Sequence, residues 1–122
     1  MKVWSVVLAS VSHYFSDMRG TPSIVTRDDE GFKVNSKSIV GLSGSTLDIL
    51  GLAIRVALMR TFLPSLSFLQ LDEPASGCDD DRETAMLGLI TACKFDQILL
   101  VTHSTLADAF SSNVISLGEA NA

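Results

Sequence analysis

Two short apolar runs in the second half of the chain constrain its fold most. Residues 67–71 and 97–102 are each about as long as one strand and are almost continuously apolar. Runs of this kind are typical of strands that are buried on both faces of a sheet. Residues 80–93, which lie between them, are predicted as a helix. A strand–helix–strand order predicts that the two strands pair in parallel through a right-handed crossover.

The chain continues with the same alternation of elements. We expect a short helix at residues 106–110 and a last strand at residues 114–117. At the start of the preceding helix, Asp80 and Glu83 have the spacing of a capping box with Asp80 as the cap. This order predicts an α/β fold in which helices flank a mostly parallel sheet.

The N-terminal segment has two possible interpretations. Residues 1–9 are short, basic at the start and then apolar, which is compatible with a signal peptide. The favoured interpretation is an amphipathic helix at residues 3–18 that ends before Gly20 and Pro22. Its apolar residues recur at spacings of three and four: Trp4, Val7, Leu8, Val11, Tyr14, Phe15 and Met18.

A small antiparallel meander is predicted to follow this helix. Residues 23–26, 32–34 and 38–40 favour short strands, with a polar turn before the second of them. Residues 45–62 then form the longest apolar segment and are predicted as a largely buried helix.

The 122 residues are enough for one domain with one core. We divide it into residues 1–41, a helix with the meander; residues 42–117, the α/β core; and a loose tail at residues 118–122. Hydrophobic residues make up 47% of the chain, which suggests an apolar surface intended for a partner. The net charge of -5 argues against a chain that binds nucleic acid by itself.

The cysteines and the hydropathy bear on the compartment. Cys78 and Cys93 have no metal-binding spacing and are interpreted as reduced thiols of a cytoplasmic protein, although a disulfide between them stays open. No apolar stretch approaches the ~20 residues that a membrane span needs, so no contact with a membrane is expected.

Polar residues follow both strands of the predicted parallel pair. Asp72 and Glu73 come at the end of the first strand, and His103 follows the second. Ligands of open α/β sheets bind at the carboxyl ends of the strands. One carboxylate there can bind Mg²⁺ and its neighbour can activate a water molecule. The alternatives are a pair of acids that opens an ordinary loop and an ordinary loop histidine.

A second candidate site precedes the long apolar helix. Ser43 and Gly44 lie where the helix is predicted to begin, and the N–H groups of a helix N-terminus favour anions. The alternative is a plain N-cap at Ser43 or Ser45.

Taken together, these motifs resemble the ATP-binding-cassette (ABC) ATPases from the signature motif onward. Residues 42–46 lie where that superfamily has Leu-Ser-Gly-Gly-Gln/Glu, and residues 68–73 resemble its Walker B strand with the catalytic glutamate. Residues 75–79 lie on its D-loop, and His103 lies on its switch histidine. The continuation of the helix and the preceding meander resemble the SMC-like repair ATPases, the SbcC-type nuclease subunits and their phage recombination counterparts.

The sequence also departs from the family pattern. Ser45 replaces the second signature glycine, Thr46 stands at the Gln/Glu position, and Cys78 is unusual in the D-loop. The chain contains no G-x-x-x-x-G-K-[ST] phosphate-binding loop and no sustained heptads.

The resemblance implies a role for each motif residue. Asp72 would bind Mg²⁺, Glu73 would position or activate the attacking water, and His103 would contact the γ-phosphate of ATP. The remaining implied residues bind the γ-phosphate held by an opposite head or couple the two sites: Ser43, Gly44, Ser45 and Asp79.

The resemblance also implies the partners. The chain would be the C-terminal lobe of an ATPase head. It would need a P-loop-bearing N-terminal lobe and a second head, and it would work with a nuclease subunit. It would reach DNA only through the larger assembly. Two alternatives stay open: a fragment of a transporter-type ABC cassette, and a degenerate lobe that binds a partner without hydrolysing ATP.

Overall fold

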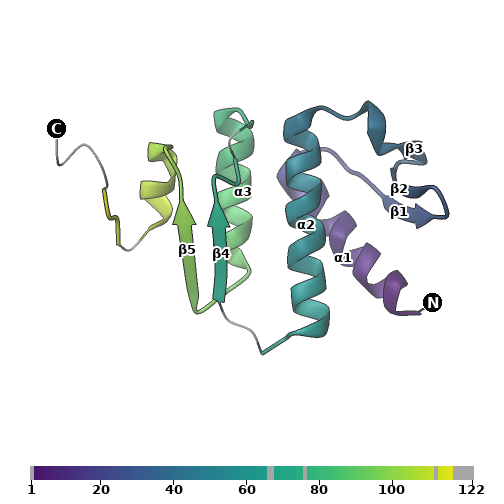
Figure 1. Cartoon of the computed structure of the whole chain (residues 1–122), viewed down its shortest axis with the longest axis horizontal. Coiled ribbons are helices and arrows are strands. Elements are labelled where there is room, and N and C mark those ends of the chain that lie inside the picture. Colours follow the sequence, from purple (N-terminus) through teal and green to yellow (C-terminus); the bar gives the residue numbers. More distant parts are fainter. Residues whose placement is uncertain (1, 66–67, 76, 112, 117–122) are drawn as a thin grey trace.

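The computed structural model describes residues 2–65, 68–75, 77–111 and 113–116, and Figure 1 shows the arrangement of the elements. In chain order these are α1 (Lys2–Arg19), β1 (Val25–Asp28), β2 (Gly31–Val34), β3 (Lys37–Ser38), the 3-10 helix η1 (Ile39–Gly41), α2 (Gly44–Phe62), β4 (Phe68–Asp72), α3 (Asp80–Ala92), β5 (Gln97–Val101) and the 3-10 helix η2 (Thr105–Phe110).

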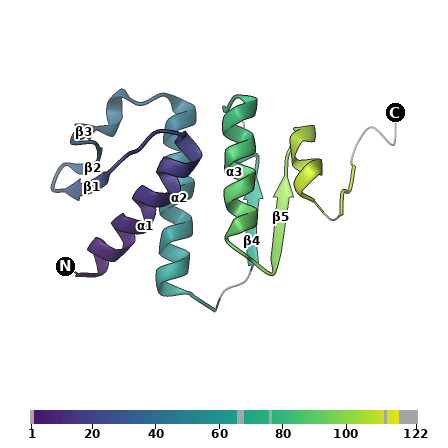
Figure 2. The ribbon, with the colours of Figure 1, turned by 180° about the vertical axis from the view of Figure 1, so that it is seen from behind.

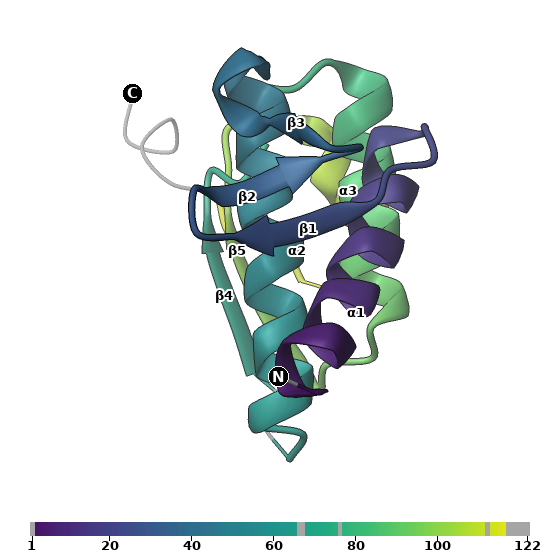
Figure 3. The same ribbon diagram turned by 90° about the vertical axis from the view of Figure 1, so that its right-hand side faces the viewer.

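The two long helices, α1 and α2, pack against each other and hold the centre of the core. The predicted amphipathic helix is confirmed, because its apolar stripe is the face that α1 buries. Figure 3 shows α1 lying alongside α2 and close to α3. The fully buried side chains of the pair are Val7, Val11, Phe15 and Met18 from α1, and Ile49, Ala53, Val56 and Ala57 from α2.

The predicted meander is present as a three-stranded antiparallel sheet in the order β1-β2-β3. Val25 pairs with Val34, and both side chains are buried against the core. The third strand is shorter than predicted, since η1 begins at Ile39, where the Ser38 hydroxyl accepts a hydrogen bond from the Val40 N–H. The meander and the segment before it therefore pack along α1, from Trp4 to Ser16.

Strands β4 and β5 pair in parallel, with Leu69 opposite Ile98 and Leu71 opposite Leu100. Helix α3 lies behind this pair in Figure 1 and in front of it in the reversed view of Figure 2. Burial alternates along both strands. It is high or intermediate for Leu69, Leu71, Ile98 and Leu100, whereas the alternate residues are exposed. The prediction that both faces are buried is therefore wrong for this chain, because α3 covers only one of them.

The larger parallel sheet that we predicted is not formed by the described residues, which contain one parallel pair and the separate meander. The predicted last strand is absent over residues 113–116, and Leu117 and the predicted tail at 118–122 lie outside the described residues. Val114 is 58% exposed and Ile115 is 84% exposed. Residues 113–116 pair with no strand of the described part of the chain, so their apolar character alone does not produce a strand.

Candidate functional site

The predicted site residues come from one end of the molecule. The carboxyl ends of β4 and β5 and the N-terminal ends of α2 and α3 all lie at the top of Figure 1. A parallel strand–helix–strand unit has this polarity, because both strands end where its helix begins. This end therefore presents strand-end side chains together with helix N–H groups.

Glu73 and His103 are brought together by the parallel pairing of their strands. His103 Nε2 lies 3.6 Å from Glu73 Oε1, and the histidine side chain is 99% exposed. The Glu73 N–H donates to the Val101 carbonyl at 2.7 Å, which extends the ladder by one residue. Glu73 has a φ of 48°, a left-handed conformation that a residue with a side chain adopts only where its surroundings hold it. The strand end thus fixes the backbone from which this carboxylate extends.

Asp72 is the last residue of β4 and pairs with Val101. Its side chain is exposed and lies on the sheet face that α3 does not cover. Asp72 and Glu73 consequently leave the strand in different directions, and the Asp72 carboxylate is open to ligands that approach the uncovered face.

Ser43 occupies the N-cap of α2, so the plain N-cap interpretation describes its geometry correctly. Its hydroxyl accepts from the Thr46 N–H at 3.2 Å and shares a hydrogen bond of 2.7 Å with Thr46 Oγ1. Gly44 is exposed, and a Cβ added there would meet no atom within 4 Å. The backbone at the start of α2 is therefore accessible from outside.

The cap of α3 is Asp79, and the predicted cap at Asp80 is wrong by one residue. Asp79 Oδ1 accepts from the Arg82 N–H at 2.8 Å, and Asp80 is already helical. The loop before Asp79 is closed by the Cys78 N–H, which donates to the Ala75 carbonyl. Burial raises the pKa of the Cys78 thiol, Arg82 opposes this shift, and the nearby Asp48 carboxylate adds to it. Cys78 and Cys93 are both free thiols.

Arg82 is a site residue that our reading of the sequence missed. Its Nη1 donates to Ser45 Oγ at 3.1 Å and to Thr46 Oγ1 at 2.8 Å. The contact joins the start of α3 to the start of α2 across more than thirty-five residues of chain. No local spacing marks such a pair, so only the fold reveals it.

The face of the β4–β5 pair that α3 leaves uncovered is apolar. Phe68 is 40% exposed, Leu99 is 47% exposed and Val101 is 50% exposed. At the outer edge of β4, Arg55 from α2 donates to the Gln70 carbonyl. Within the described residues, the outer edge of β5 pairs with no strand.

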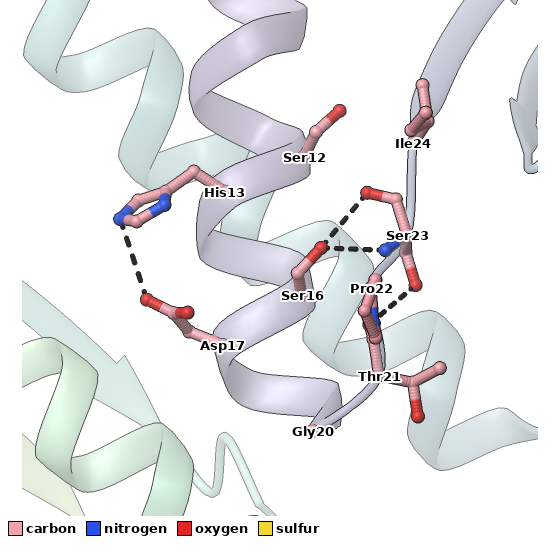
Figure 4. A pocket seen from close by; sticks show the side chains of 9 residues that line it. All are labelled: Ser12, His13, Ser16, Asp17, Gly20, Thr21, Pro22, Ser23 and Ile24. Atoms are coloured by element: carbon pink, nitrogen blue, oxygen red, sulfur yellow. Dashed lines mark hydrogen bonds and ion pairs between the residues drawn. The ribbon is translucent and has the colours of Figure 1, made fainter.

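A separate hollow lies beside the C-terminal half of α1 (Figure 4) and contains none of the predicted site residues. Ser16 Oγ accepts from the Ser23 N–H and donates to the Ser23 carbonyl, while His13 pairs with Asp17 at 3.5 Å. These bonds hold the segment after α1 against the helix. We therefore interpret the hollow as part of the connection between α1 and the meander.

Two further findings concern the described part of the chain only. No group of three His, Cys, Asp or Glu side chains comes together there as a metal site. None of its helices combines the length and the apolar character that crossing a membrane requires.

Comparison with known proteins finds one significant sequence relative among curated proteins, and no protein-family model matches the chain. The relative is a DNA double-strand break repair Rad50 ATPase from Saccharolobus solfataricus, 37% identical over 67 residues. The matched segment is 53% of this chain and 8% of the relative, so the chain corresponds to a small part of that protein.

Solved structures show a closer match in fold than in sequence. A structure from work on ATP-driven dimerisation and DNA-stimulated activation of SMC ATPases has a TM-score of 0.79 at 18% identity, covering 97% of this chain and 80% of that one. An SMC head bound to the C-terminal winged-helix domain of ScpA has a TM-score of 0.73 at 17% identity, over 91% of this chain and 38% of that one. The SMC head domain from Thermotoga maritima has a TM-score of 0.66 at 21% identity, over 88% of this chain and 41% of that one.

Proposed function

We propose that the chain, whose fold is similar to SMC head domains, is the C-terminal lobe of an SMC/Rad50-type ABC ATPase head. In this proposal it provides Glu73 as the catalytic glutamate and His103 as the switch histidine. It also provides residues 42–46 at the start of α2, which we call the signature turn. A P-loop-bearing N-terminal lobe provides the phosphate cradle that the chain lacks. Hydrolysis of ATP then requires both lobes and a second head.

The observation that carries the proposal is the pairing of Glu73 with His103. Two side chains from strands separated by a helix meet at 3.6 Å, at the sheet end where ligands of open α/β sheets bind. Glu73 is 32% exposed and is held by its backbone bond to Val101, whereas His103 extends into solvent. The carboxylate is therefore partly enclosed at the strand end, and the imidazole is open to a substrate.

This geometry suits a general base beside a phosphate-sensing donor. Glu73 would accept the proton of a water that attacks the terminal phosphorus of ATP. His103 would donate a hydrogen bond from its ring to an oxygen of that phosphate. Because its Nε2 also lies near Glu73 Oε1, the histidine would exchange that carboxylate for the phosphate as substrate arrives. A positioned base typically contributes ~10²–10⁴ in rate.

Asp72 is the residue that fits the expected Mg²⁺. Its carboxylate is exposed at the strand end, and Mg²⁺ is commonly bound by one or two carboxylates together with water and substrate phosphates. In this proposal the nucleotide and a second lobe provide the remaining ligands. The ion would neutralise phosphate charge when bound.

We assign two surfaces to the N-terminal lobe: the uncovered sheet face, and the outer edge of β5, which pairs with no strand among the described residues. The face carries Phe68, Leu99 and Val101, and an unpaired strand edge readily accepts another strand. A lobe seated there would bring its P-loop next to Asp72, at the rim of the same face. Ser43, Gly44 and Ser45 would contact the nucleotide of a second head, and Asp79 would couple the two sites through its loop.

We infer the wider assembly from the sequence relative. We infer a role in the repair of DNA double-strand breaks, since the relative is a double-strand break repair ATPase. A nuclease subunit and a role in recombination are further parts of the proposal and come from the sequence resemblance. DNA would be reached through that assembly, because this chain carries a net charge of -5. The free thiols of Cys78 and Cys93 favour a reducing, cytoplasmic compartment.

The test begins with a tagged form of the chain, purified from its source cell with the proteins bound to it. We expect a P-loop-bearing polypeptide with heptads among them. In that complex, Glu73→Gln should lower ATP turnover by ~10²–10⁴ and prolong ATP-dependent association of heads. The matched control is Glu30→Gln, the same change at an exposed turn of the meander, which should leave turnover within about twofold.

A second candidate is the degenerate lobe that binds a partner without hydrolysis. The observation in its favour is that Ser45 and Thr46 replace signature residues and have hydroxyls that already bond Arg82. Turnover that is equal in the wild type and in Glu73→Gln, with the partner still bound, would select this candidate. Recovery of a membrane protein in place of a heptad-containing partner would select the transporter-type cassette.

A further inference from the structure

Arg82 links two loops that lie far apart in sequence and close together at the proposed site. Its guanidinium reaches both Ser45 Oγ and Thr46 Oγ1, with donor–acceptor distances of 3.1 Å and 2.8 Å. Hydrogen bonds from a charged donor are roughly twice as strong as neutral ones. The first turn of α2 is thus bound to the first turn of α3.

Both ends of this link are fixed by further contacts. On the α3 side, the Arg82 N–H donates to the Asp79 carboxylate at 2.8 Å, so the arginine is anchored to the loop that carries Asp79. On the α2 side, Thr46 is only 4% exposed and its hydroxyl also bonds the Ser43 hydroxyl at 2.7 Å. The chain Asp79–Arg82–Thr46–Ser43 therefore connects the D-loop position to the N-cap of the signature turn.

The loop after β4 is also in steric contact with the first turn of α2. A Cβ added to Gly77 would lie 3.5 Å from Ser45 Cβ and 3.8 Å from an Asp48 carboxylate oxygen. The loop after β4 therefore packs directly on the first turn of α2. A movement of one loop has to be taken up by the other.

We propose that Arg82 is a positioning residue that couples the loop after β4 to the signature turn within one chain. It holds the Ser45 and Thr46 hydroxyls, and through Thr46 it holds the Ser43 cap and the backbone of Gly44. The two positions that depart from the family's signature pattern provide the hydroxyls that Arg82 binds. Ser45 and Thr46 are thus the acceptors of the Arg82 donor. The consequence for ATP rests on the proposed function, whereas the coupling of the two turns does not.

The test uses the purified complex with its P-loop-bearing partner and two separate readouts. Hydrogen–deuterium exchange of the amides at residues 44–47 reports the signature turn itself. The dissociation constant of ATP-dependent head association, measured in the Glu73→Gln background, reports whether the signature turn contributes to that association. We expect Arg82→Gln to speed exchange about tenfold and to weaken association about tenfold, the range for loss of a charged hydrogen bond.

A double-mutant cycle separates coupling from a general loss of structure. If Arg82 acts through Thr46, Arg82→Gln and Thr46→Val together should produce about the same fold-change as either alone. Arg82→Lys should restore part of the effect, because both hydroxyls are bound by one guanidinium nitrogen, Nη1, and the shorter lysine keeps a charged donor but not the same reach. The control is Arg27→Gln on the meander, where the guanidinium stacks on Trp4; it should move neither readout.

The outcomes distinguish the two proposals. Unchanged exchange at residues 44–47 in Arg82→Gln, or fold-changes that multiply in the double variant, would overturn the coupling. Faster exchange in a complex that shows no ATP-dependent association in the wild type supports the coupling and contradicts the proposed function. Faster exchange together with weaker association supports both.

Discussion

The helix pair with its meander and the β4–α3–β5 unit satisfy their apolar surface in different ways. In the first region α1 and α2 bury each other's apolar stripes, and the meander packs along α1. In the second region α3 covers one face of the parallel pair, and Phe68, Leu99 and Val101 stay exposed on the other. The facing stripes of the first region are buried within the chain, although apolar side chains such as Val6 and Val40 stay exposed there. In the second region the exposed apolar side chains share one sheet face, which fits a partner.

The difference follows from the kind of element in each region. A helix has one apolar stripe and needs one neighbour, whereas an apolar strand of a parallel sheet has two faces and two edges to satisfy. Predictions that test this contrast therefore compare equivalent residues in the two regions.

The largest expected effect is in the helix pair. Phe15 is fully buried between α1 and its neighbours, so Phe15→Ala should lower the free energy of unfolding by about 3–5 kcal/mol. Urea denaturation monitored by circular dichroism measures this. A loss below about 1 kcal/mol would mean that the two helices do not depend on each other as the packing indicates.

The matched change in the other region is Phe68→Ala. Phe68 is 40% exposed on the uncovered face, so its loss should change the free energy of unfolding by less than about 1 kcal/mol. The same variant should weaken binding of the P-loop-bearing lobe in a titration with that partner. Strong destabilisation with unchanged partner binding would remove the contrast between the regions.

An intermediate effect is expected at the two helix caps. Ser43 caps α2 and Asp79 caps α3, each through a side-chain oxygen that accepts a backbone N–H. Ser43→Ala and Asp79→Ala should each cost about 1 kcal/mol of stability. Replacing either residue by Asn should recover most of that loss, because Asn is also a good cap. Failure of both Asn variants would show that the residues act through other contacts.

The smallest effect is expected from alkaline pH, at the place where the regions meet. Burial raises the pKa of the Cys93 thiol above its ordinary value of 9.0, and burial also raises the pKa of Tyr14, with Cys93 adding to the shift. The folded state thus retains these protons more tightly than the unfolded state. Their contribution to stability is complete below pH 9 and is lost as the pH rises through the folded pKa values.

Urea midpoints at neutral and strongly alkaline pH measure this loss. Cys93→Ser replaces the ionisable thiol by a hydroxyl of nearly the same size that keeps its proton. The fall in the urea midpoint should therefore be smaller in that variant. Lys33 also titrates in alkali, because its bonds to Asp28 raise the pKa of its ammonium, so Lys33→Gln measures the separate loss of that surface pair. An equal fall in the wild type and in Cys93→Ser would exclude the thiol as a source.

Much of the candidate site could be predicted because each motif is local. The apolar run that ends in Asp72 and Glu73, and the next run with His103 after it, specify two strand ends, and parallel pairing then brings those ends together. The cap of α3 was misplaced by one residue because Asp79, Asp80 and Asp81 are chemically equivalent in sequence. Only the backbone conformation selects Asp79.

What the sequence by itself determined is the kind and order of most elements and the strand ends that carry the carboxylates and the histidine. Periodicity and turn chemistry act over a few residues, so a reader of the chain can follow them. The tertiary structure decided which sheet face stays open, that residues 113–116 form no strand, and that Arg82 reaches Ser45 and Thr46. Those features depend on which distant segments come into contact, and the burial and hydrogen bonding of one segment are set by its neighbours in space.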